Sequence, residues 1–204
     1  MLEDVKAFWE EMHKKDEKSA LSGCQYEETL DFMCVNDYII KEAKVLEVGV
    51  GLGYVTKGLF ENGIKVTALD ISDVSLDRVS PFCEAVYNIR DIESLPVDYF
   101  DVIICNNVVQ HVTTDLLIEE LKIIIRSMKK EGVFAVEFVS NNSFEDNGVT
   151  PTLDEIKNGG LCRTPKFLEG IFNDIGAECS LVFDKAVDLG IVQGHHVFHV
   201  TKKV

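Results

Sequence analysis

The chain has 204 residues, of which 46% are hydrophobic, and this is enough to bury the core of one α/β domain. Its 35 acidic residues outnumber the 20 basic ones and give a formal charge of −15, which disfavours nucleic acids and anionic membranes as partners because both repel a negative surface. We find no basic and apolar leader pattern and no apolar stretch of membrane-spanning length, so we expect a cytoplasmic protein with no membrane or nucleic-acid partner.

The six cysteines contain no C-x-x-C pair, and several fall within apolar patterns. We therefore expect free thiols in a reducing compartment rather than disulfides or a zinc site. No repeat or linker divides the chain. We expect a single domain over residues 1–204, with a helical cap over residues 1–43 and a core over residues 44–204; the oligomeric state stays open.

Two amphipathic helices are predicted in the cap. Between residues 2 and 18, apolar residues such as Phe8 and Trp9 recur at helical spacing among charged ones, and a second helix is predicted over residues 27–41. The expected buried side of the second helix comprises Leu30, Met33, Cys34, Tyr38 and Ile39.

The first core strand is predicted at residues 45–48, a short apolar and β-branched run. Gly49, Gly51 and Gly53 follow at alternate positions before a helical pattern begins. Glycine adopts positive φ without steric cost and lets a ligand lie against the backbone, and the N–H groups of the next helix face that ligand. The segment therefore predicts a site for a small molecule with an anionic or strongly accepting end.

A second buried strand is predicted at residues 66–70 and ends in Asp70. An acid at the tip of this strand is placed to accept hydrogen bonds from a ribose diol. The nicotinamide fingerprint G-x-G-x-x-G is absent, because from Gly49 it requires glycine at position 54, where the chain has Tyr54. The spacing is instead E-x-G-x-G-x-G, which begins at Glu47.

Helices and strands are predicted to alternate through the middle of the chain. Ser72 caps a short helix that ends at Val79, and a longer helix begins at Thr113 or Thr114. The strands are predicted at residues 84–88, 101–106 and 132–138.

Residues 140–160 hold few large apolar side chains and many Asn, Asp, Glu and Gly, so we expect a long loop that acts as a lid or binding element. Pro165, behind Thr164, predicts the start of a helix that ends at Gly176. The last two strands are predicted at residues 179–183 and 197–200.

These features together resemble the class I S-adenosylmethionine-dependent methyltransferases. The resemblance rests on the E-x-G-x-G-x-G pattern, on Asp70, and on the segment from Phe100 to Val112, which ends in an apolar-x-His-apolar pattern at His111. It covers the chain from Lys44 onward. It implies a Rossmann-like three-layer α/β sandwich with a seven-stranded, mostly parallel sheet of order 3-2-1-4-5-7-6, an antiparallel seventh strand, and S-adenosylmethionine as cofactor.

The resemblance also implies which residues hold the cofactor. Asp91 would meet the exocyclic amine of adenine and Ile92 its ring, although an Asx-type turn also explains Asp91. The expected cofactor contacts are Glu47, Gly49, Gly51, Gly53, Asp70, Ile71, Asp91, Ile92, Asn106 and Asn107. Because N-terminal helices cover the cofactor in such proteins, Trp9, His13 and Tyr26 are candidate pocket residues; anchoring of its helix is the simpler role for Trp9.

Methyl transfer from a sulfonium is an in-line displacement, to which alignment in a dry pocket contributes on the order of 7–11 kcal/mol without a catalytic triad. A hydroxyl or ammonium acceptor must still lose a proton, which requires a base. His111 is the candidate catalytic base, and a helix cap or packing over the cofactor explains it equally well. Glu137, near the end of the fifth strand, either reaches the acceptor or is a solvated strand-end acid.

The histidines near the C-terminus do not predict a metal site. Strand alternation places His195 and His199 on one face and His196 on the other, with no acid or cysteine nearby in sequence to complete a ligand set. The pair Asn106-Asn107 lacks the proline and aromatic residue that follow in amino-methylating nucleic-acid enzymes, and no Pro-Cys pair marks a cytosine C5 nucleophile. We therefore expect no metal.

The sequence thus predicts a methyltransferase that uses S-adenosylmethionine on a small or medium-sized acceptor, through oxygen or nitrogen. The alternatives are a protein methyltransferase, a cofactor-binding regulator without catalysis, and an NAD-dependent oxidoreductase, which Tyr54 disfavours. The acceptor itself stays open, because the N-terminal helices and the long loop, where the resemblance is weakest, build its pocket.

Overall fold

A computed structural model describes residues 2–14, 26–141, 163–188 and 192–203. The strands are β1 (Lys44–Val48), β2 (Lys65–Asp70), β3 (Ala85–Asn88), β4 (Phe100–Cys105), β5 (Met128–Asn141), β6 (Ala177–Asp188) and β7 (Val192–Lys202). The helices are α1 (Leu2–Lys14), α2 (Tyr26–Phe32), α3 (Tyr54–Glu61), α4 (Asp73–Val79), α5 (Thr114–Ser127) and α7 (Pro165–Asp174), with the 3-10 helices η1 (Ser80–Phe82), η2 (Ile89–Ser94) and η3 (Val109–His111).

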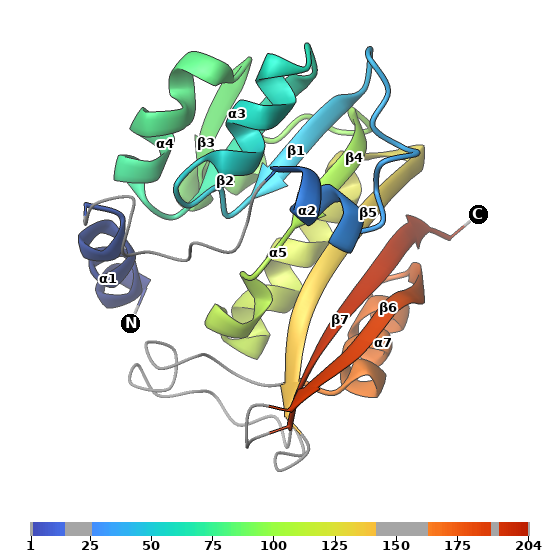
Figure 1. Cartoon of the computed structure of the whole chain (residues 1–204). Helices are drawn as coiled ribbons and strands as arrows, with labels where there is room; N and C mark the ends of the chain where they lie inside the picture. The colour runs from blue at the N-terminus through green and yellow to red at the C-terminus, as the bar shows by residue number, and fades with distance from the viewer. Residues whose placement is uncertain (1, 15–25, 142–162, 189–191, 204) are drawn as a thin grey trace.

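Within these residues the strands form one seven-stranded sheet of order β3-β2-β1-β4-β5-β7-β6 (Figure 1). Neighbours from β3 to β5 are parallel, whereas β7 is antiparallel to both β5 and β6. This confirms the Rossmann-like sheet that the resemblance implied. The carboxyl ends of β1, β2, β4 and β5 therefore meet at one edge, where β7 begins.

The central strand β1 is buried on both faces. Val45 packs in a cluster with Leu59 of α3, whereas Leu46 belongs to the cluster on the opposite face, with Leu121 of α5. Successive side chains of a strand point to opposite faces, so this apolar run fills both layers of core. Burying each such side chain contributes about 1.5–3 kcal/mol.

Two predicted helix starts are confirmed by their hydrogen bonds. Ser72 Oγ accepts a hydrogen bond from the Ser75 N–H at 3.2 Å, and Thr164 Oγ1 accepts one from the Phe167 N–H at 3.2 Å. Pro165 occupies the first turn of α7. Each cap satisfies a backbone N–H that has no partner inside its helix.

The second N-terminal helix is shorter than predicted. It ends at Phe32 because Cys34 adopts a left-handed conformation (φ 55°), and its N–H donates to the Asp31 carbonyl while the Val35 N–H donates to the Leu30 carbonyl. This Schellman arrangement ends a helix and brings two buried apolar residues, Leu30 and Val35, together. The prediction of Cys34 and Tyr38 as buried is therefore wrong; both are exposed.

The last strands are longer than their apolar patterns indicated. The connection between them was expected over residues 184–194, but residues 184–188 and 192–194 instead extend β6 and β7 as an antiparallel pair. Pairing satisfies the backbone regardless of side-chain polarity. The predicted loop at residues 140–160 falls almost wholly on residues 142–162, which lie outside the described ranges.

The two N-terminal helices pack in different places: α1 against α4, and α2 against α3 (Figure 1). Among the described residues, no helix combines the length and the apolar character that crossing a membrane requires.

Candidate cofactor-binding site

The glycine segment after β1 turns sharply at the carboxyl edge of the sheet. Gly49, Gly51 and Gly53 all have positive φ (76°, 51° and 83°). A Cβ on Gly49 would lie 2.2 Å from Val108 Cγ2, and one on Gly53 would lie 2.5 Å from Val79 Cγ1. These two glycines are therefore required by packing within the protein.

Gly51 differs, because an added Cβ would overlap no neighbouring atom of the protein. The nearest heavy atom to that Cβ would be His13 Nε2, at 3.9 Å. The backbone at Gly51 is thus the part of the turn that a ligand can approach closely.

Asp70, at the end of β2, ties this turn to the neighbouring strand. Its Oδ2 accepts a hydrogen bond from the Gly51 N–H at 3.1 Å, and its Oδ1 accepts one from the Ser72 N–H at 2.8 Å. Burial raises the pKa of Asp70, while these two hydrogen bonds act to lower it. A carboxylate offers about four lone-pair sites, so Asp70 keeps acceptor capacity for a ligand hydroxyl.

Glu47, the acid of the E-x-G-x-G-x-G pattern, lies buried between β1 and α3. Thr56 Oγ1 donates a hydrogen bond to its Oε2 at 2.5 Å. Burial raises its pKa to about 8, so at neutral pH the carboxyl is largely protonated. Glu47 thereby joins the helix to the strand across the glycine turn.

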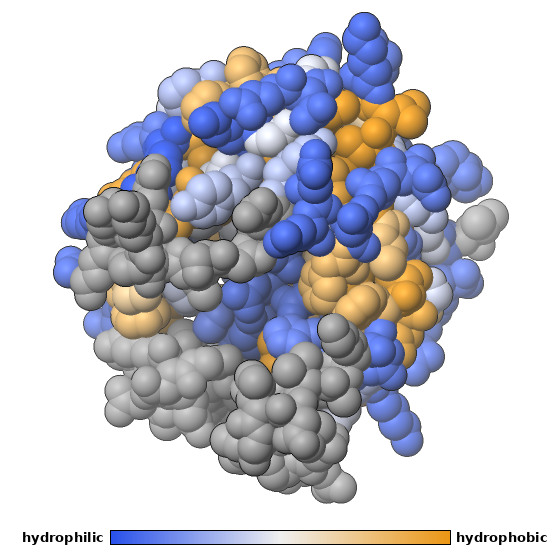
Figure 2. All heavy atoms as spheres, viewed as in Figure 1, coloured by the Kyte–Doolittle hydropathy of each residue, from blue (hydrophilic) through white to orange (hydrophobic). Residues whose placement is uncertain are grey.

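A cavity of about 540 Å³ opens at this edge of the sheet, within the size range of small-molecule sites. In Figure 2 a recess with hydrophilic residues is visible on this face. The predicted cofactor residues that line the cavity are Glu47, Gly49, Gly51, Gly53, Asp70, Ile71, Asn106 and Asn107. The structure thus brings together eight of the ten.

The structure does not place Asp91 and Ile92 in the cavity wall. Asp91 is exposed, Ile92 is part of the hydrophobic core, and Ile89 lines the cavity instead. The reason is a kink in η2, where the backbone is not helical at Asp91 (φ −104°, ψ 16°). The Asx turn in this segment is made by Asn88, whose Oδ1 accepts the Arg90 N–H at 3.1 Å. Adenine contacts from Asp91 and Ile92 stay a prediction.

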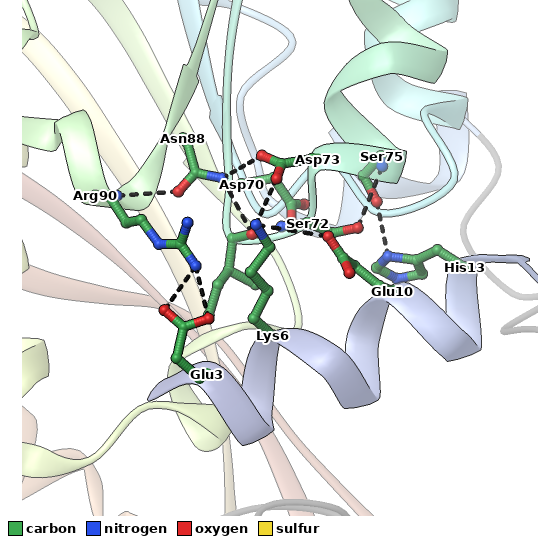
Figure 3. Close-up of polar contacts among 11 residues, drawn as sticks. Glu3, Lys6, Glu10, His13, Asp70, Ser72, Asp73, Ser75, Asn88 and Arg90 are labelled. Carbon is green, nitrogen blue, oxygen red and sulfur yellow. Dashed lines mark hydrogen bonds and ion pairs between the residues drawn. The ribbon is translucent and has the colours of Figure 1, made fainter. Parts of the chain in front are cut away.

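Helix α1 contributes to the cavity lining, and polar contacts hold it beside α4 (Figure 3). Lys6 forms an ion pair with Asp73, and Arg90 NH2 lies 2.7 Å from Glu3 Oε1. Lys6 is buried, but its partner Asp73 and both members of the Arg90–Glu3 pair are exposed, so these contacts orient the helix rather than supply much stability.

The inner face of α1 brings aromatic rings to the cavity. His13 is buried, its Nδ1 shares a hydrogen bond with Ser75 Oγ at 2.7 Å, and burial lowers its pKa. The Trp9 ring stacks on His13 with centroids 5.6 Å apart. Trp9 and His13 both line the cavity, whereas Tyr26 packs on Gly58 of α3 outside it.

His111, in η3, also lines the cavity, and the rings of Trp9 and His111 meet edge to face at 4.8 Å. This contact fits a packing role and leaves the catalytic role a prediction. Arg163, which no sequence signal singled out, is buried and donates hydrogen bonds of 2.6 Å to the carbonyls of Val109 and Val112. It therefore fixes the turn that carries His111.

Glu137 is not a solvated acid, which corrects one of the two predicted roles. Its side chain is 2% exposed, and it accepts hydrogen bonds from the Asn107 N–H at 2.7 Å and from His195 Nδ1 at 3.0 Å. The carboxylate raises the pKa of His195. The sequence could not indicate this pair, because it depends on how β5 and β7 align.

The remaining histidines keep the predicted alternation. His199 Nε2 meets the Met33 carbonyl at 2.9 Å on the face of α2, while His196 stacks on Phe138 on the other face. Among the described residues, no group of three or more His, Cys, Asp or Glu side chains is arranged to hold a metal ion.

Part of the core is similar to a known protein family. Residues 46–136 match the family described as Methyltransferase domain. A probable non-canonical nonribosomal peptide synthetase of Salinispora arenicola, CymA, is 25% identical over 122 residues, which are 50% of this chain and 2% of that protein. The chain thus spans a very small part of this curated relative.

Solved structures share the fold at low identity. A methyltransferase from Methanosarcina mazei, described as S-adenosylmethionine-dependent, is 14% identical with a TM-score of 0.65, and the match covers 84% of this chain and 98% of that one. The DhpI–SAH complex is 16% identical with a TM-score of 0.65, over 99% and 98% of the two chains. At these identities the likeness shows the fold.

Proposed function

We propose that this chain, which carries a class I S-adenosylmethionine-dependent methyltransferase domain, transfers a methyl group from that cofactor to an oxygen or nitrogen atom of a small or medium-sized acceptor. The observation that carries the proposal is the hydrogen bond between Gly51 and Asp70 in the cavity wall. It places backbone that a ligand can approach closely beside a carboxylate that can accept further hydrogen bonds. Their roles in cofactor binding are part of the proposal.

The residues present suit this cofactor. A methionyl and ribosyl ligand can lie on Gly51 and offer its hydroxyl groups to Asp70. The described part of the cavity wall includes the carboxyl groups of Glu47, Asp70 and Glu120 and neither lysine nor arginine, so no fixed positive charge opposes a cationic sulfonium. When bound, S-adenosylmethionine supplies an electrophilic methyl group on a sulfur that leaves as a neutral thioether.

The apolar part of the cavity lining supports an acceptor with an apolar body. Phe8, Trp9 and Met12 of α1 face the cavity together with Leu116 and Val139. The acidic and apolar lining favours a neutral or cationic acceptor over a phosphorylated one. Closure of such a wall over the ligand would exclude water and hold the acceptor in line.

The test is calorimetric titration with S-adenosylmethionine, S-adenosylhomocysteine and NADH. We expect binding of the first two only. NADH binding without a response to S-adenosylhomocysteine would contradict the proposal and favour the oxidoreductase. Release of S-adenosylhomocysteine in the presence of small acceptors separates an enzyme from a cofactor-binding regulator, and labelling of protein substrates would favour a protein methyltransferase. Fractionation of cells would test the cytoplasmic location.

A further inference from the structure

We propose that His195, held by Glu137, is the base that takes the proton of the methyl acceptor, and that the acceptor binds against this pair as an alcohol, phenol or amine. This inference rests on the proposed methyl transfer. The sequence predicts His111, which follows β4, as the base, whereas this inference assigns the role to His195 on β7.

The hydrogen bonds of Glu137 fix the protonation of the His195 ring. Glu137 Oε1 lies 3.0 Å from His195 Nδ1, and Oε2 accepts the Asn107 N–H at 2.7 Å. A carboxylate only accepts hydrogen bonds, so Nδ1 carries the proton. In the neutral ring the lone pair is then on Nε2, which is the atom that can accept a proton.

The pair is built into the sheet rather than carried on a loop. Val139 of β5 pairs with His195 of β7, and Glu137 pairs with Val197, so Glu137 and His195 are diagonal neighbours on one face. Glu137 is 2% exposed, which leaves its carboxylate little freedom. A charge buried in this way is stable only when it is hydrogen-bonded.

Backbone strain next to the pair also indicates a functional site. Asn107, directly after the turn out of β4, has φ 60°, a conformation that costs a residue with a side chain about 1–2 kcal/mol. Glu137 accepts its N–H, and Gln110 donates to its side-chain oxygen. Such strain persists where the surroundings hold it, and it clusters at active sites. Glu137 thus couples the β4 turn, which borders the cofactor cavity, to His195.

His195 is accessible from two cavities. Its side chain is 37% exposed and lines both the large cavity and an adjoining one of about 230 Å³. The smaller cavity is lined by Glu28, Thr29, Phe32, Asn106, Asn107, Glu137 and His195. Because Asn106, Asn107 and His195 belong to both walls, an acceptor in the smaller cavity would lie beside the cofactor site.

The charges around His195 suit a proton-bearing acceptor. Glu137 raises the pKa of His195 and burial lowers it, with the carboxylate as the larger effect. On the side of α2 the smaller cavity has Glu28, and the described lining includes no lysine or arginine. The site thus favours neutral or cationic acceptors. The site does not favour carboxylate or thiolate acceptors, because they are negatively charged and need no base.

His195 takes the acceptor's proton during methyl transfer. As the acceptor attacks the methyl carbon, its O–H or N–H proton passes to His195 Nε2. The acceptor's electron pair forms the new bond to carbon, and the sulfur keeps the pair of the broken C–S bond. The resulting imidazolium faces the Glu137 carboxylate, which stabilises its charge.

Histidine nitrogen NMR of the ligand-free protein tests the pair without any acceptor. With ¹⁵N-labelled histidine, and His195→Gln to assign the signals, we expect neutral His195 to carry its proton on Nδ1, and its pKa to fall in Glu137→Gln. A proton on Nε2, or an unchanged pKa in Glu137→Gln, would overturn the inference.

Turnover tests the base role with a panel of alcohols, phenols, amines, thiols and carboxylic acids. We expect His195→Gln to lower kcat about 10²–10⁴-fold with alcohols, phenols or amines, with S-adenosylhomocysteine affinity within about twofold of the wild-type value. His199→Gln is the matched control, because His199 lies on the same face of β7 but bonds to the Met33 carbonyl. It should keep full kcat.

Three outcomes separate the failure of this inference from that of the proposed function. Full turnover by His195→Gln together with loss in His111→Gln would return the base role to His111, and turnover of thiols or carboxylic acids alone would remove the need for a base. Absence of S-adenosylhomocysteine binding by the wild-type protein would instead refute the proposed function.

Discussion

Replacing Glu47 by Gln should remove much of the pH dependence of stability in the ligand-free protein. Burial raises the pKa of this carboxyl from 4.5 to about 8. The folded state therefore binds more protons than the unfolded state between these values. The contribution to stability is complete below pH 4.5 and is lost as the pH rises through about 8.

The size of the effect follows from the pKa change. Each pH unit within this window changes the free energy of unfolding by about 1.4 kcal/mol, so this one group should lower stability by about 2–3 kcal/mol between about pH 5.5 and about pH 7.5. Glutamine resembles the protonated acid in shape and has no titrating proton. The variant should match the wild type at the lower pH and exceed it at the higher.

Urea unfolding at the two pH values measures this difference. Other groups with shifted pKa values, such as Asp70 and His13, are present in both proteins, so the difference between the two pH dependences reports Glu47 together with its electrostatic interaction with Asp70. Glu61→Gln, an exposed change at the end of α3, is the control and should keep the wild-type pH dependence. An identical fall in stability for wild type and Glu47→Gln would refute a buried, largely protonated Glu47.

Three further predictions concern the site. Gly51→Val should fold with a lower urea midpoint, because a β-branched residue is strained at this positive φ, and should lose calorimetric binding of S-adenosylhomocysteine. Gly49→Val should fail to fold because its Cβ would also overlap a neighbouring side chain; full affinity in folded Gly51→Val would place the site elsewhere. Asp70→Ala should weaken this binding about 10- to 150-fold and also lower the urea midpoint, because the carboxylate accepts two backbone N–H groups; affinity within about twofold would exclude the ribose role. Arg163→Ala should lower the free energy of unfolding by about 3 kcal/mol or more, because two charged hydrogen bonds to carbonyls are lost; a wild-type urea midpoint would contradict its role in holding the turn of His111.

The sequence by itself determined those features whose cause is local. The apolar run of β1, the cap at Ser72 and Pro165 at the start of α7 each act on residues within one turn or strand, and the structure confirms them. The glycine turn and Asp70 belong to this class as well, because a βαβ unit brings the ends of consecutive strands to the same edge.

Local patterns were misleading where a competing local conformation existed. The apolar spacing after Phe32 suited a helix, but the left-handed conformation of Cys34 ended it. Such helix ends are usually marked by glycine, and a cysteine at this position did not indicate one. Ile92 lies in the core next to the kink at Asp91, and its adenine contact, which the family resemblance implied, stays a prediction.

Only the tertiary structure decided the contacts that join distant segments. Glu137 and His195 are 58 residues apart, and they meet because the antiparallel register of β5 and β7 makes them diagonal neighbours. Arg163 also joins distant segments. Its backbone N–H donates to the carbonyl of Val139 near the end of β5, while its side chain donates to the turn that carries His111. Strand register is set by side-chain packing on both faces of the whole sheet, and that information is spread over the chain rather than contained in any one motif.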